Sequence, residues 1–272
     1  YTRKMQKKCV FHCIFLVILQ NFSYLCALIC KTMSEHLSKA QVKWVRSLQQ
    51  KKNRDAEGVF VAEGEKCVND LLEAFPLVLL ATPENATPVE IEQMSSLRTP
   101  QGTIAVFRKP IAHNQYPLSN LILALDGVQD PGNLGTIIRT CDWFGIHDIL
   151  CSRDTADCFN PKVVQATMGA IFRVRMHYVD LPELSRLVLD MGGKVYGTFL
   201  DGKNMYERDL DNGSVSPSVI VIGNESEGIS PAMAELVSDR LYIPPYPADR
   251  SGSESLNVAI ATAITCSEFR RG

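Results

Sequence analysis

The chain has 272 residues, of which 46% are hydrophobic and 21% are charged, and its 30 acidic and 28 basic side chains leave a net charge of −2. This composition fits a globular protein with one large domain or two small ones, and it excludes low-complexity and collagen-like chains. Because the chain is slightly acidic, composition alone does not suggest a nucleic-acid partner, and any RNA contact would need a local basic surface.

The nine cysteines and five histidines are scattered along the chain, without a C-x-x-C pair or the spacing of metal ligands. We therefore expect no metal site. The cysteines in the body of the chain are interpreted as buried thiols of a reduced, cytoplasmic protein.

Residues 1–32 carry basic side chains and no acidic ones, and the run at 9–30 is uncharged and largely apolar. That is the shape of a signal peptide or a membrane anchor. However, polar residues such as His12 and Gln20 interrupt the run, no small-residue cleavage site stands out, and Met33 begins an ordinary cytosolic start. We expect residues 1–32 to lie outside the native protein, with a membrane anchor as the alternative, and leave them out of the fold.

Residues 33–109 have the pattern of a small α/β domain. A basic amphipathic helix is predicted at 38–50, since Val42 and Val45 share one face and Ser38 is suited to cap its N-terminus. Residues 110–120, with two prolines, are predicted to be a linker. Three short strands are predicted at 59–62, 77–81 and 103–107, and a second helix runs through 71–72.

Basic side chains gather in this first unit. We predict that they contact RNA phosphates, with a solvated helix face as the plain alternative. The six residues are Lys39, Lys43 and Arg46 on the helix, and Lys51, Lys52 and Arg54 in a basic loop after it.

Residues 121–272 alternate between apolar strands and helices. This alternation predicts a parallel sheet with helices on both faces. Because ligands bind at the carboxyl ends of such strands, the polar segments that follow them are the candidate site. Strands are predicted at 121–125, 149–150, 195–199, 219–222 and 241–243, and helices at 134–144, 161–168, 181–191 and 255–269.

The first polar segment runs from Asp130 to Arg139. Asn133 is expected to cap a helix N-terminus and to shape a pocket, with Arg139 pointing at an anionic or hydroxyl-bearing substrate. A well-capped helix whose Arg139 is solvated or paired with Asp142 would explain the same residues.

Two further segments follow later strands. At 222–229, Gly223 is expected to leave the backbone open to a ligand and Glu225 to be buried beside it, unless the glycines only serve positive φ angles. The plain explanation of the last segment is a strand end at 243–244 and a helix that begins with Ser255 as its N-cap. The Asn257 side chain is less easily explained in that way.

Together, the three segments resemble the motifs of the SpoU-type (TrmH-like) RNA 2′-O-ribose methyltransferases of the SPOUT class. The resemblance implies that residues 121–272 form a trefoil-knotted domain that binds S-adenosylmethionine. It also implies that residues 33–109 form a ribosomal-protein-like RNA-binding domain. The family pattern further implies a homodimer whose sites combine residues of both subunits, acting on ribosomal or transfer RNA.

The resemblance also implies roles for single residues. The catalytic residue would be Arg139, with Asn133, Glu225, Ser255 and Asn257 holding it and the ribose. The cofactor contacts would come from Gly223, Asn224, Gly228, Ile243, Pro244 and Leu256. The stretch 245–254 departs from the family pattern by being longer and more charged, which leaves its substrate contacts open.

Two rival functions remain to be weighed. A non-catalytic RNA-binding or ribosome-assembly factor on the same fold is the alternative, and the joint presence of Asn133, Arg139 and Glu225 argues against it. A nicotinamide-dependent dehydrogenase is disfavoured because no G-x-G-x-x-G follows a predicted strand.

Overall fold

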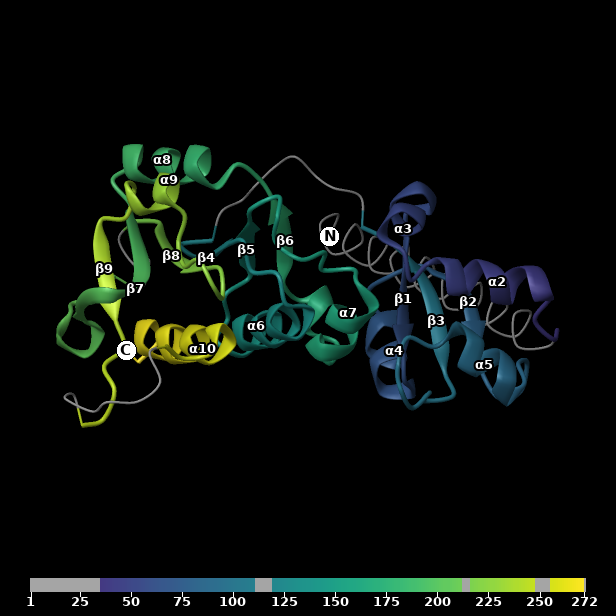
Figure 1. The fold of residues 1–272 in the computed structure, drawn as a ribbon. Helices are drawn as coiled ribbons and strands as arrows, with labels where there is room; N and C mark the ends of the chain where they lie inside the picture. Colours follow the sequence, from purple (N-terminus) through teal and green to yellow (C-terminus); the bar gives the residue numbers. More distant parts are fainter. Residues whose placement is uncertain (1–34, 111–118, 212–215, 248–254, 272) are drawn as a thin grey trace, which may run out of the picture.

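The computed structural model of the chain describes residues 35–110, 119–211, 216–247 and 255–271 (Figure 1). The predictions for residues 1–32, for most of the linker and for most of the stretch 245–254 lie outside these ranges. No helix within the described ranges is long and apolar enough to cross a membrane. The described residues form a three-stranded sheet and a six-stranded sheet.

The first unit is a three-stranded antiparallel sheet of order β1-β3-β2 with helices around it. Its basic helix begins as predicted, because Ser38 and Gln41 form a reciprocal capping box. The elements are α2 (Lys39–Ser47), α3 (Lys51–Glu57), β1 (Val59–Glu63), α4 (Glu65–Leu72), β2 (Leu77–Ala81), α5 (Pro88–Met94) and β3 (Ile104–Arg108).

One prediction for this unit was wrong, and one helix was not predicted. The basic residues after α2 form helix α3 and not a loop, and this helix ends at Gly58, whose φ of 62° suits a left-handed C-cap. Helix α5 was missed, although Thr87 and Glu90 form a capping box at its start.

The second unit is a six-stranded sheet in which every pairing is parallel, in the order β6-β5-β4-β8-β7-β9. The predicted parallel sheet is therefore confirmed. Its strands are β4 (Leu121–Asp126), β5 (Asp148–Cys151), β6 (Arg175–Tyr178), β7 (Lys194–Asn204), β8 (Ser218–Gly223) and β9 (Asp239–Tyr242).

Helices cover both faces of this sheet, as predicted (Figure 1). Helices α8 (Leu181–Asp190) and α9 (Pro231–Ala234) pack on one face, where Val188 and Met233 join a core with Val219. Helices α6 (Pro131–Trp143), α7 (Pro161–Thr167) and α10 (Val258–Phe269) pack on the other.

The strand order reverses direction at the centre of the sheet. From β4 the chain moves outward through β5 and β6, and it then returns to the other side, where β8 lies next to β4. Open α/β sheets bind ligands in the crevice outside the carboxyl ends of the strands at such a switch point. Two of the three polar segments follow β4 and β8, so the fold places them at this crevice.

Candidate active site

The three polar segments are joined by side-chain hydrogen bonds at the carboxyl edge of the sheet. The Asn133 Nδ2 group donates to Glu225 Oε1 at 3.0 Å, and the Asn257 Nδ2 group donates to Asn133 Oδ1 at 3.0 Å. Segments separated by more than ninety residues in the sequence thus meet through one chain of three side chains. We call this chain, Glu225–Asn133–Asn257, the polar triad.

The Glu225 carboxylate is the acceptor at one end of the polar triad. Besides Asn133, the backbone N–H groups of Gln129 and Asp130 donate to it, each at 3.3 Å. Partial burial raises the pKa of Glu225, but the hydrogen bonds from Asn133 and from nearby backbone N–H groups outweigh burial and bring the pKa below its usual value. Glu225 is therefore ionised at neutral pH, and it fastens the loop after β4. The expectation that Glu225 is buried was wrong, because the residue is exposed.

The structure corrects the caps of two helices. Helix α6 begins earlier than predicted, and Asp130 is its N-cap, accepting from the Asn133 backbone N–H at 2.8 Å. The Asn133 side chain is therefore free for the polar triad. Helix α10 is capped by Asn257, whose Oδ1 accepts from the N–H of Ala259 at 2.9 Å, and not by Ser255. One amide thus caps a helix and continues the triad.

The loop after β8 is tied across to the loop after β4. Asn224 donates from Nδ2 to the Gly127 carbonyl at 2.6 Å, while its Oδ1 accepts from the N–H groups of Ser226 and Glu227. A Cβ on Gly223 would lie 2.2 Å from the Gly228 carbonyl carbon. The backbone of its own loop therefore fills the space on the Cβ side of Gly223, and the predicted cofactor contact of this residue stays a prediction.

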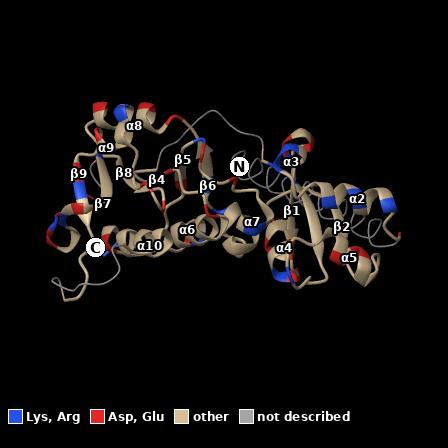
Figure 2. Ribbon diagram, viewed as in Figure 1, with Lys and Arg blue, Asp and Glu red and all other residues tan. Residues whose placement is uncertain are grey.

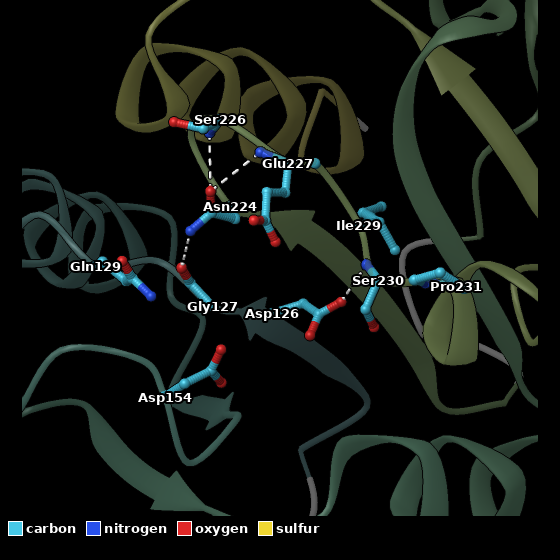
Figure 3. Close-up of a pocket in the computed structure, with 11 residues that line it drawn as sticks. Asp126, Gly127, Gln129, Asp154, Asn224, Ser226, Glu227, Ile229, Ser230 and Pro231 are labelled. Atoms are coloured by element: carbon cyan, nitrogen blue, oxygen red, sulfur yellow. Dashed lines mark hydrogen bonds between the residues drawn. The ribbon is translucent and has the colours of Figure 1, made fainter.

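A hollow of about 320 Å³ opens beside these loops, at the ends of β4 and β8 (Figure 3). The carboxylates of Asp126 and Asp154 face it, and Asp126 accepts from the Ser230 N–H at 2.7 Å. Sequence reasoning missed these residues, although Asp126 stands where a buried strand ends in a glycine. Of the six expected cofactor residues, Asn224 and Gly228 line this hollow, and the other four do not.

The remaining expected cofactor residues lie after β9 and before α10. Ile243 and Pro244 are half-buried at the end of the strand. The Leu256 side chain is 49% exposed, and its backbone makes no hydrogen bond with another described residue. An exposed apolar side chain next to unpaired backbone groups can receive a ligand that has both a ring face and hydrogen-bonding edges.

Arg139 does not join the polar triad within one protomer. It lies six residues after Asn133, about 9 Å further along α6, and its side chain is exposed. Asp142, its suggested partner, instead accepts three hydrogen bonds from Arg173, of 2.8 Å, 2.9 Å and 2.8 Å. Among the described residues, none pairs with Arg139. Its guanidinium is thus available to a ligand or to a second chain.

Arg139 belongs to an exposed stripe of α6 that also includes Gly132, Thr136 and Trp143. Trp143 is 85% exposed, and Ile260 on the neighbouring α10 is 51% exposed. Helix α10 is apolar on every side, a pattern found in helices that are covered all round. This surface has the character of one that another molecule covers.

The basic surface predicted on α2 is present. Lys39, Lys43 and Arg46 are exposed on one face of the helix and border a hollow of about 360 Å³ beside α5. Basic positions recur along the ribbon of α2 (Figure 2). Lys51 and Lys52 are exposed on α3. These residues can reach phosphates, and their contact with RNA stays a prediction.

Arg54 is the exception, and its predicted RNA contact was wrong. Its side chain is 1% exposed, and its guanidinium forms an ion pair of 2.6 Å with Asp157 in the second unit. It also donates to the carbonyl groups of Leu48 and Gln49 at the end of α2. A guanidinium buried in this way cannot reach a phosphate.

Comparison with known proteins agrees with this geometry. The model of the SpoU rRNA Methylase family matches residues 120–267, and the model of the MRM3-like substrate binding domain matches residues 39–105. The 23S rRNA (guanosine(2553)-2′-O)-methyltransferase RlmP of Bacillus subtilis is 31% identical over 252 residues, which cover 87% of this chain and 98% of the relative.

Two solved structures are similar over nearly the same length. One, from Porphyromonas gingivalis, is assigned to the TrmH family of RNA methyltransferases; it has a TM-score of 0.77 and 41% identity, covering 86% of this chain and 98% of that one. The other is the AdoMet-bound rRNA methyltransferase of Sinorhizobium meliloti, with a TM-score of 0.74 and 31% identity, covering 87% and 96% of the two chains.

Proposed function

The chain belongs to the SpoU family of rRNA methylases, and on that premise we propose that it transfers a methyl group from S-adenosylmethionine to a ribose 2′-hydroxyl of ribosomal RNA. The observation that carries this proposal is the polar triad. It joins the three family segments at the carboxyl edge of the sheet. Arg139 stands exposed further along the helix that carries Asn133, and it has no partner among the described residues.

The residues present fit the cofactor. S-adenosylmethionine carries an adenine ring, and the exposed Leu256 side chain beside free backbone groups offers it an apolar face and hydrogen-bonding partners. Ile243 and Pro244 would hold the same group from the end of β9, with Gly223, Asn224 and Gly228 from the loop after β8. When bound, the cofactor supplies a methyl group on a positively charged sulfur.

The protein's own contribution is orientation. Holding two reactants in line can supply roughly 7–11 kcal/mol of a barrier, so the site needs placement more than strong acid or base chemistry. The polar triad keeps the loop after β4 and the start of α10 in one arrangement. Asn133, Ser255 and Asn257 would then present amide and hydroxyl groups to the ribose.

Arg139 is proposed as the catalytic residue. A guanidinium with a pKa above about 12 is a poor general base, so its role is to position the 2′-oxygen or a neighbouring phosphate and to stabilise developing negative charge. Fixed donors aimed at such charge act strongly in a site from which water is excluded.

We further propose that the active form is a homodimer. The exposed stripe of α6 and the apolar surface of α10 support this, since a second copy would cover Trp143 and Ile260. The dimer would also bring Arg139 of one protomer beside Asn133 of the other, which a single protomer does not achieve. The trefoil knot, a transfer-RNA substrate and a cytoplasmic location stay predictions.

Transfer of labelled methyl groups from S-adenosylmethionine to unmodified ribosomal and transfer RNA tests the activity. We expect a 2′-O-methylated nucleoside from ribosomal RNA, and sedimentation of the protein as a dimer. Cofactor binding without transfer to either pool would point to another RNA. Absence of cofactor binding would favour the non-catalytic RNA-binding alternative.

A further inference from the structure

The β5 loop, which we define as residues 152–160, is one of the segments through which the two units of the molecule meet; helix α7, directly after it, also packs against β1. Asp157 of this loop accepts from Arg54 of helix α3 at 2.6 Å, with side-chain exposures of 12% and 1%. The same guanidinium donates to the carbonyls of Leu48 and Gln49 at 2.9 Å and 2.8 Å. Arg54 thus fastens the C-terminal end of the basic helix α2 to the second unit.

An aromatic contact lies beside this ion pair. The rings of Phe60 on β1 and Phe159 in the β5 loop have centroids 4.9 Å apart. The Lys109 ammonium stands 5.2 Å from the centroid of the Phe159 ring and binds Asp55 at 2.6 Å. Charge and packing therefore hold the two units together at the same place.

The other end of the β5 loop reaches the active site. Ser152 Oγ accepts from the Gly127 N–H at 2.8 Å, and the Ala156 N–H donates to the Val128 carbonyl at 2.9 Å. Asp154, between these two contacts, lines the hollow beside the polar triad. Gly127 and Val128 immediately precede Gln129 and Asp130, whose backbone N–H groups donate to the Glu225 carboxylate.

The energetics of the ion pair favour a positioning role. A buried ion pair contributes little net stability, because the cost of removing two charges from water offsets their attraction. Here that cost is increased, since Arg54 Nε is buried and finds no hydrogen-bond partner among the described residues. The pair instead favours one fixed arrangement of the two units that carry Arg54 and Asp157.

We propose that Arg54 is a positioning residue for methyl transfer: through Asp157 it holds helix α2 at a fixed place relative to the polar triad. RNA bound on Lys39, Lys43 and Arg46 then meets the reaction centre in register. This inference rests on the proposed function. It separates Arg54 from the other basic residues of its unit, which touch the RNA itself.

The test compares two RNAs in the full chain. One is a ribosomal RNA fragment long enough to reach both units, and the other is a short hairpin that carries the target nucleotide alone. For Arg54→Ala we expect kcat/KM on the long RNA to fall about tenfold towards that of the hairpin, since small misplacements at the reacting atoms are costly. On the hairpin the variant should match the wild type. Arg54→Lys, which keeps one donor for Asp157, should recover part of the loss.

Salt dependence distinguishes positioning from phosphate contact. For Lys43→Ala, the matched control, the slope of log affinity against log salt should fall by about 0.7–0.9, the effect of one lost phosphate contact. For Arg54→Ala the slope should stay as in the wild type. A reduced slope for Arg54→Ala, or an equal loss on both RNAs, would overturn the proposal.

Hydrogen exchange without RNA tests the clamp, by which we mean the Arg54–Asp157 contact between the two units, independently of catalysis. In Arg54→Ala, amides of the β5 loop should exchange faster, although the substitution lies in the other unit. Unchanged exchange there would contradict the clamp. If instead the wild type methylates neither RNA while the exchange result holds, the proposed function fails and the clamp survives.

Discussion

The basic surface of α2 and the polar triad beside α6 differ in how their side chains are held. Lys39, Lys43 and Arg46 stand exposed on one helix face, each acting by its own charge. In the triad, Asn133 is linked at 3.0 Å on both sides, so no member keeps its position alone. On α2, each basic residue can therefore add a small, salt-sensitive contribution to RNA affinity. In the polar triad, the loss of one side chain disturbs the positions of the other two.

The largest effect should come from Arg139→Ala. Removing a donor aimed at developing negative charge typically lowers turnover by about 10²–10³-fold, and cofactor binding should persist because Leu256 and Ile243 are untouched. Methyl transfer and cofactor titration measure the two separately. Arg186→Ala, on the exposed face of α8, is the matched control and should behave as the wild type. Loss of cofactor binding in Arg139→Ala would contradict the assignment.

The next effect tests whether the polar triad acts as a unit. Asn133→Ala and Asn257→Ala should each lower turnover by about 10–100-fold, and the double variant should be hardly worse than either, because residues that act together are strongly non-additive. Single-turnover rates for the three variants provide the measurement, with the exposed Asn69→Ala as a control. Losses that multiply would mean that the two amides act independently.

A smaller effect concerns acid stability. Partial burial raises the pKa of Glu225, but hydrogen bonds from Asn133 and backbone N–H groups bring it below the usual value. The folded state therefore holds the ionised form, which contributes stability above the unfolded pKa and loses it as pH falls through the lowered folded pKa.

Glu225→Gln should remove this contribution. The melting-temperature difference between wild type and variant should stay constant from about pH 8 to pH 5 and shrink in stronger acid. Thermal unfolding across this range measures it, with the exposed Glu235→Gln as control. A difference that grows as the solution becomes more acidic would contradict the ionised state.

The smallest effect belongs to the basic surface. Lys39→Ala and Lys43→Ala should each weaken RNA binding by a few-fold at low salt, with effects that nearly add, and each should lower the salt slope by about 0.7–0.9. Filter binding across a salt series is sufficient. Unchanged slopes would mean that α2 is merely a solvated helix face.

The sequence predicted the parallel sheet well because its central strands are buried on both faces. Residues 121–125 and 219–222 read as continuous apolar runs, so β4 and β8 were found, together with the polar segments after them. Strand β6 was missed because it lies at an edge, and its four residues are exposed or half-buried.

The helix starts and Arg54 required information that lies far away in the sequence. Asp130 and Asn133 are both good caps, and the choice between them depends on Glu225, which engages the Asn133 amide. The burial of Arg54 depends on Asp157, 103 residues later. In both cases the local sequence indicated a residue type suited to a role, but a partner distant in the sequence determined which role the residue has.

The most direct test of the whole account mixes two variants with strongly reduced activity, Arg139→Ala and Asn133→Ala. If Arg139 of one protomer completes the polar triad of the other, subunit exchange creates one intact site in each mixed dimer. Methyl transfer to ribosomal RNA should then return to about a quarter of the wild-type level, since half of the dimers are mixed. If both variants exchange subunits and no activity returns, Arg139 does not act across the dimer, and the proposed composite site is wrong.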